Sequence, residues 1–80
     1  MVQTGETIRI ATDADVVLVR QQVREWAVRL GFSLVDQTKM VTAASEIARN
    51  TILYGQGGTV RFEVLQNGPR KGLRLIFEDQ

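Results

Sequence analysis

Three segments of the chain alternate polar with apolar residues, the period-2 pattern of half-buried β-strands. They span residues 6–11, 59–66 and 73–79. The side chains that this alternation places on the inner face are Ile8, Ile10, Val60, Phe62, Val64, Leu73, Leu75 and Phe77. By the same parity, Asp79 falls on the inner face, one step beyond Phe77 at the end of the last strand.

Between the first two strands, apolar residues recur at the three- and four-residue steps typical of amphipathic helices. The first helix is expected to begin in the capping sequence 12–15 and to end at Gly31. A second helix is predicted over residues 36–54, with the glycine-containing residues 55–58 as a connector to the next strand. The inward stripe of the first helix is Val16, Val19, Val23, Trp26, Ala27 and Leu30, with Trp26 as its core anchor.

The order of these elements, β-α-α-β-β, predicts an α+β two-layer sandwich with both helices over one face of the sheet. Residues 67–72 contain the turn residues of a hairpin, in a connection longer than a two-residue loop. Three strands are few for one sheet, so we expect residues 1–80 to form the N-terminal portion of a larger domain. The open sheet edge could also support a homodimer or an exchange of elements between copies.

One polar pair stands out on the second predicted helix. Glu46 and Asn50 are four residues apart, so their side chains lie on the same side of the helix and can act on one ligand. A helical wheel places both at the edge of an apolar stripe. That stripe consists of Met40, Ala43, Ala44, Ile47, Thr51 and Tyr54. Taken alone, such a pair is most often part of a solvated helix face, and Asp79 alone reads as an ordinary polar strand end.

Composition excludes several kinds of chemistry. The 80 residues include no Cys and no His, which excludes disulfides, thiolate metal sites and imidazole acid-base catalysis. Positive and negative residues nearly balance, with a net charge of +1, so the composition does not indicate nucleic-acid binding. The N-terminus lacks the features of a signal peptide, and no segment approaches the ~18 apolar residues of a membrane span. A cytoplasmic location without membrane attachment is therefore expected.

The segment around the polar pair resembles a known motif. Residues 45–50, Ser-Glu-Ile-Ala-Arg-Asn, resemble the N-box of the GHKL (Bergerat-fold) ATPases and kinases, and residues 77–80 resemble the opening of the next box. Further matches extend the resemblance to essentially all eighty residues, but to only about the first half of the family's domain. They are residues 8–10, 15–21, 30–32 and 35–37, and they are most similar to the anti-sigma-factor serine kinases, in particular the switch kinase of the bacterial stressosome.

The resemblance implies a role for each polar residue in a site that binds Mg²⁺ and ATP. Glu46 would be the general base toward a substrate serine, Asn50 the Mg²⁺ ligand, and Asp79 the acceptor for the adenine amine. The implied partners are STAS-domain anti-sigma antagonists or scaffold proteins of bacterial stress signalling. The family's Gly-x-Gly stretch and ATP lid have no counterpart up to Gln80, so the chain alone is expected to be inactive. The alternative is a non-catalytic protein-interaction module of sigma-factor regulation.

Overall fold

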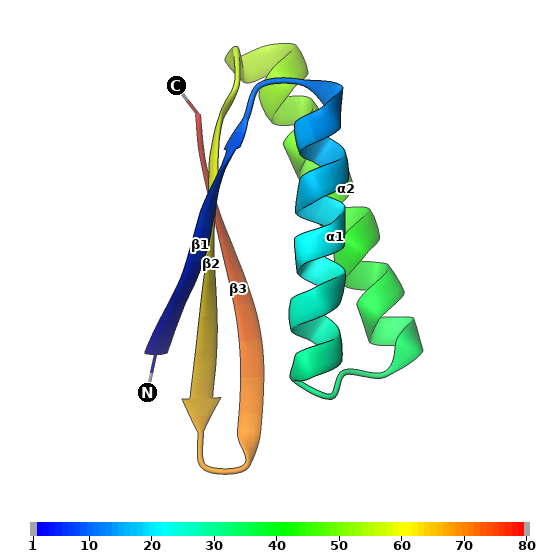
Figure 1. The fold of residues 1–80 in the computed structure, drawn as a ribbon, viewed down its shortest axis with the longest axis vertical. Helices are drawn as coiled ribbons and strands as arrows, with labels where there is room; N and C mark the ends of the chain where they lie inside the picture. The colour runs from blue at the N-terminus through cyan, green and yellow to red at the C-terminus, as the bar shows by residue number, and fades with distance from the viewer. Residues whose placement is uncertain (1, 80) are drawn as a thin grey trace.

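The predicted order of elements is confirmed by the structure, a computed structural model that describes the backbone of residues 2–79 and the side chains of residues 5–79. The elements are β1 (Val2–Ile10), α1 (Asp13–Arg29), α2 (Leu34–Gly55), β2 (Gly58–Asn67) and β3 (Arg70–Asp79). The strands form one antiparallel sheet in the order β1-β2-β3. Both helices lie on the same side of this sheet (Figure 1), which makes a two-layer α+β fold.

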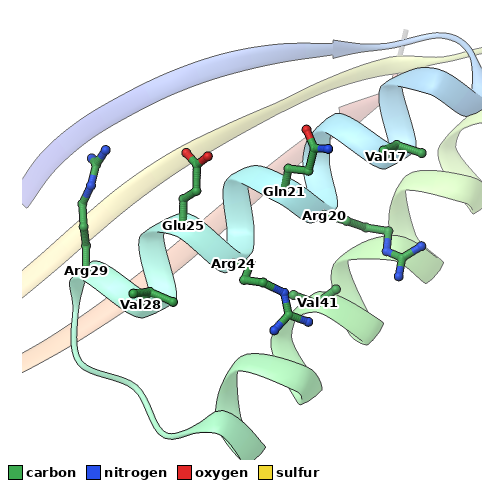
Figure 2. A pocket seen from close by; sticks show the side chains of 8 residues that line it. All are labelled: Val17, Arg20, Gln21, Arg24, Glu25, Val28, Arg29 and Val41. Carbon is green, nitrogen blue, oxygen red and sulfur yellow. The ribbon is translucent and has the colours of Figure 1, made fainter.

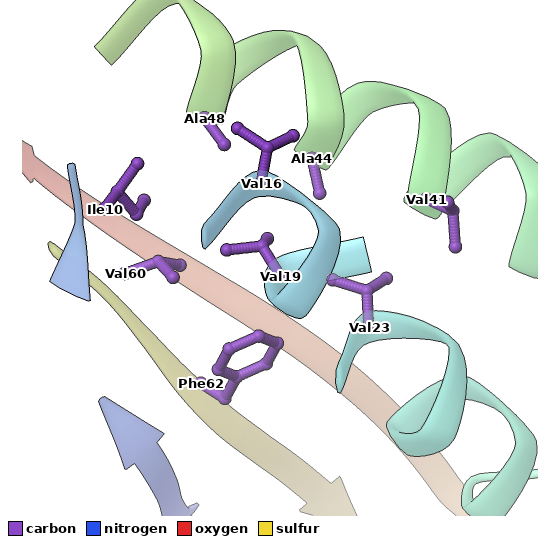
Figure 3. Packing of buried hydrophobic residues seen from close by; sticks show 9 residues of the cluster. All are labelled: Ile10, Val16, Val19, Val23, Val41, Ala44, Ala48, Val60 and Phe62. Atoms are coloured by element: carbon purple, nitrogen blue, oxygen red, sulfur yellow. The ribbon is translucent and has the colours of Figure 1, made fainter. Parts of the chain in front are cut away.

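The core lies between the sheet and the two helices (Figure 3). Ile10, Val60 and Phe62 from the strands are fully buried, as their alternation predicts. The helices close the cluster with Val16, Val19, Val23, Val41, Ala44 and Ala48. The inward residues of β3 are only partly buried, although they pack against the same cluster. This face of the sheet is therefore covered best along the central strand β2.

The start of α1 is fixed by an acidic side chain. Asp15 Oδ2 accepts hydrogen bonds from the backbone N–H groups of Ala11 at 2.8 Å and Thr12 at 3.0 Å. These two bonds, led by that from Ala11, hold the pKa of the Asp15 carboxyl below its usual range. At the other end Gly31 has a φ of 77°, as predicted for a glycine that stops the helix.

Trp26 packs against the core but is only partly buried, so its prediction as the core anchor is confirmed only in part. The indole lies beside Gly5 of β1, where a Cβ would come within 2.9 Å of Trp26 Cζ2. The Arg29 guanidinium lies 5.1 Å from the centre of the ring, a cation–π contact. The smaller residues Val23 and Ala27 of the predicted inward stripe are fully buried, as expected.

The second helix begins two residues earlier than predicted, at Leu34 and not at Asp36. Ser33 is its N-cap, and Ser33 Oγ accepts a hydrogen bond from the backbone N–H of Asp36 at 3.1 Å. Asp36 therefore lies in the first turn, where its charge complements the helix dipole. Leu34 and Val35 are 70% and 62% exposed, so the start of this helix carries no buried apolar pattern.

The predicted apolar stripe of α2 is rotated about the helix axis relative to the buried face. The residues that are buried are Val41, Ala44, Ser45, Ala48 and Thr51. By contrast Ile47 and Tyr54 are 45% and 84% exposed. Ser45 and Thr51 tolerate burial because their hydroxyls donate to the carbonyls of Val41 (2.8 Å) and Ile47 (2.9 Å). The face that carries Glu46 and Asn50 consequently lies farther from the core than the wheel predicts.

The hairpin connection is shorter than predicted. β2 and β3 pair as far as Asn67 and Arg70, which leaves a two-residue loop of Gly68 and Pro69. Gly68 has a φ of 62°, as the primed two-residue turns require.

The outer face of the sheet, away from the helices, carries paired charges. Glu63 is 9% exposed and lies opposite Arg74 on β3, which forms an ion pair with it. Arg61 Nε lies 3.6 Å from Glu63 Oε2, and Arg61 also reaches Glu78. Within residues 2–79, neither helix has the combined length and apolarity that crossing a membrane requires.

Gly58 is expected to be indispensable for the sheet. A Cβ at this position would lie 2.0 Å from the carbonyl oxygen of Glu78, a backbone atom that cannot move without breaking the β2–β3 pairing. We expect Gly58→Ala to lower the free energy of unfolding by about 3 kcal/mol. Urea denaturation measures this loss. The control is Gly72→Ala, where the nearest atom, Leu65 Cβ, is 3.9 Å away, and equal losses in the two variants would contradict the assignment.

The Asp15 cap predicts a pH-dependent contribution to stability. Because its pKa is lowered in the folded state, the carboxylate stabilises the fold above its usual titration range. This contribution is lost as the pH falls through the lowered folded-state pKa. Asp15→Asn should therefore lower the melting temperature at neutral pH, and the difference from wild type should shrink in acid. Asp13→Asn, in the same helical turn, is the control, and a pH-independent difference for Asp15→Asn would contradict the cap.

Candidate functional site

The C-terminal half of α2 and the end of β3 border an open hollow of about 390 Å³. Its walls combine apolar side chains with one amide and one carboxylate, a composition typical of small-molecule sites. The lining residues are Ile47, Asn50, Thr51, Tyr54, Gly55, Phe77 and Asp79. Two of the three residues predicted to form a site, Asn50 and Asp79, therefore meet there.

The sheet register brings Asp79 to the end of α2. Asp79 pairs with Gly58, the first residue of β2, and β2 follows α2 after a short connection. The carboxylate lies directly against Gly55, where a Cβ would come within 2.9 Å of Asp79 Oδ1. The helix ends in the left-handed residue Gln56, with a φ of 59°, which turns the chain toward the sheet. The inward parity of Asp79 thus becomes a contact with the helix layer.

Glu46 lies outside the hollow. It is exposed, one helical turn before Asn50, and it is not among the lining residues. Within the described part of the chain, no hydrogen bond or ion pair of Glu46 is found, so its carboxylate is open to solvent. The rotation of α2 turns the face of both Glu46 and Asn50 away from the core, and Glu46 lies one turn farther from the helix end where Gly55 and Asp79 border the hollow.

The hollow offers few ligands for a metal ion. Among residues 2–79 there is no group of three or more acidic, His or Cys side chains that could hold a metal by itself. The oxygens available in the hollow are those of the Asn50 amide and the Asp79 carboxylate, besides the Thr51 hydroxyl. Such a set fits Mg²⁺, which commonly takes one or two protein oxygens and completes its shell with phosphates and water. It does not fit a closed all-protein metal site.

Several lining residues are not predicted as site residues. Ile47, Thr51 and Tyr54 are assigned by the wheel to the core stripe, and Gly55 to a connector. Tyr54 gives the clearest signal in the sequence for a site residue, because this large aromatic residue stands at the predicted end of a helix, next to Gly55. In the structure its side chain is 84% exposed. Gln80, the last residue of the second resembling motif, lies outside the described residues, so the structure describes that motif only as far as Asp79.

Comparison with characterised proteins identifies a similar chain. Serine/threonine-protein kinase RsbT of Bacillus subtilis (strain 168) is 45% identical over 73 residues. The matched segment is 91% of this chain and 55% of that kinase, so the chain spans about half the length of this relative. No protein-family profile matches the chain, and no solved structure does. The resemblance to the anti-sigma-factor serine/threonine kinases is therefore confirmed by a relative that matches nearly the whole of this chain.

Proposed function

We propose that this chain forms the nucleotide-binding portion of an anti-sigma-factor-type protein serine/threonine kinase with a GHKL (Bergerat) fold. The observation that carries the proposal is the 45% identity to RsbT over 91% of the chain. The order β-α-α-β-β, with Glu46 and Asn50 on α2 and Asp79 at the end of β3, is compatible with that fold. Because the chain spans 55% of the relative, the kinase activity is proposed for the protein that contains it.

The hollow between α2 and β3 is the proposed adenine and magnesium site. Asp79 would accept a hydrogen bond from the adenine amine, because an ionised carboxylate only accepts. Ile47, Tyr54 and Phe77 supply apolar surface against which a planar base can lie. Asn50 would contribute its amide oxygen to Mg²⁺, and bound Mg-ATP supplies the phosphoryl group that the reaction transfers.

Glu46 is the proposed general base. Its carboxylate is exposed to solvent one turn from Asn50, where a side chain of a protein substrate could reach it. There it can accept the proton of a serine hydroxyl as that oxygen attacks phosphorus. The serine would belong to an STAS-domain regulator of bacterial stress signalling in the cytoplasm.

Two substitutions on α2 should separate binding from chemistry in the protein that contains this chain. Asn50→Ala should weaken Mg²⁺-dependent ATP binding at least about tenfold, because the proposed metal ligand is lost. Glu46→Ala should leave binding within about twofold but slow phosphoryl transfer by about 100-fold or more. Calorimetry measures the first quantity and transfer of labelled phosphate the second. Thr42→Ala, an exposed position one turn before Glu46, is the control, and unchanged transfer in Glu46→Ala would exclude the proposed base.

The proposed contact of Asp79 with the adenine amine can be tested by comparing two nucleotides. Removal of the acceptor in Asp79→Ala should weaken ATP binding about tenfold or more, since the adenine amine is left without its partner. Inosine triphosphate lacks that amine, so its weaker affinity should change much less. Competition against a fluorescent ATP analogue gives both affinities. Equal losses for the two nucleotides would show that Asp79 does not recognise the amine.

Non-catalytic regulation by protein contact is the second candidate, favoured by the open, arginine-rich groove on the other side of the helices. Calorimetric titration of Mg-ATP distinguishes the two functions. We expect weak or no binding to the isolated chain and clear binding to the protein that contains it. If neither the isolated chain nor the protein that contains it binds Mg-ATP, the non-catalytic interaction module is the function that remains.

A further inference from the structure

An open groove of about 960 Å³ runs along the outer side of α1, apart from the hollow at the end of α2. Figure 2 shows that Arg20 and Arg24 extend from α1 toward α2, on the side where Val41 lies. The groove shares no lining residue with the hollow. A role for this groove is therefore independent of the proposed nucleotide site.

The groove has an exposed valine toward each end. Val17, one turn into α1, is 49% exposed, and Val28, the next-to-last residue of the helix, is 57% exposed. Val17, Gln21, Arg24 and Val28 follow one another at steps of four, three and four, so they form a single line along the outer face of α1. A line of this period is complementary to the side-chain ridges of another helix.

The groove also concentrates positive charge. Its lining contains three arginines and one glutamate, a net charge of +2 against +1 for the whole chain. In the described part of the chain, no salt bridge involves Arg20 or Arg24. Arg29 at the end of the groove lies over the Trp26 ring and has no ion pair with a carboxylate among the residues that the structure describes. Guanidinium groups without partners are well suited to bind carboxylates in a bidentate manner.

We propose that this groove docks an acidic amphipathic helix of a partner protein. The apolar side of that helix would cover Val17 and Val28, and its Asp or Glu residues would pair with Arg20 and Arg24. The exposed valines on either side of the two arginines favour a peptide over a nucleic-acid backbone, which would bring phosphates but no matching apolar surface. Charge complementarity then selects an acidic partner helix over a basic one.

A designed peptide tests the proposal on the chain as it exists. The probe is a fluorescein-labelled helix of about 20 residues, with Leu at helical spacing and Glu at the remaining positions. Fluorescence anisotropy should show saturable binding, weaker at high salt. The same peptide with Lys for Glu should bind at least about tenfold more weakly. Amide chemical-shift changes should map to α1 and the region around Val41. Absence of saturable binding, or shifts confined to the hollow or the outer sheet face, would overturn the proposal.

Matched charge reversals locate the contact. Arg20→Glu combined with Arg24→Glu should weaken binding of the acidic peptide at least about tenfold. Arg70→Glu combined with Lys71→Glu makes the same charge change at exposed positions of the β2–β3 hairpin and should alter binding by less than about twofold. An equal loss of peptide binding in both double variants would indicate diffuse electrostatic attraction and would overturn the proposal that the peptide binds in the groove.

Sedimentation of the chain without peptide tests a different occupant. We expect that the Arg20 and Arg24 reversals do not change the mass of the chain in solution. If the chain forms a dimer that these reversals dissociate, a second copy of the chain occupies the groove, and the proposal of an acidic partner helix is overturned.

Discussion

The small side chains on one face of α2 set the orientation of the whole helix. Ala44, Ser45 and Ala48 are buried between the two helices and the sheet, where only short side chains allow close approach. Since this face is turned inward, the bulkier Ile47 and Tyr54 must point sideways and outward. The core packing and the hollow beside β3 are thus two consequences of one helix rotation.

Much of the fold follows from local pattern. The strands were predictable where their inner faces alternate, but β1 begins at Val2, four residues before the predicted start, and its pairing with β2 is irregular between Thr4 and Thr7. The start and end of α1 were predictable because Asp15 and Gly31 act within a few residues of the helix ends. The rotation of α2 was not predictable from hydrophobicity. A buried Ser45 reads as polar on a helical wheel, whereas in the fold its hydroxyl is satisfied by the carbonyl of Val41 and its small size decides the packing.

The meeting of Asn50 and Asp79 in the candidate site was predictable to the extent that it depends on parity and register. The inward parity of Asp79 and its pairing with Gly58 carry the carboxylate to the end of α2, where it meets Asn50 in one hollow. The position of Glu46 depends instead on the rotation of α2, which the sequence pattern misjudged. The sideways position of Tyr54 follows from the same rotation and could not be foreseen either.

The ion pairs on the outer face of the sheet limit how a larger domain can be built around this one. A second helical layer there would have to bury Arg61 and Arg74 over the already buried Glu63, at a large desolvation cost for the two arginines. Additional strands beside β1 or β3 would leave that charged face in water and use backbone groups at the sheet margins. The sheet can therefore be widened within its own plane, but it remains a two-layer structure.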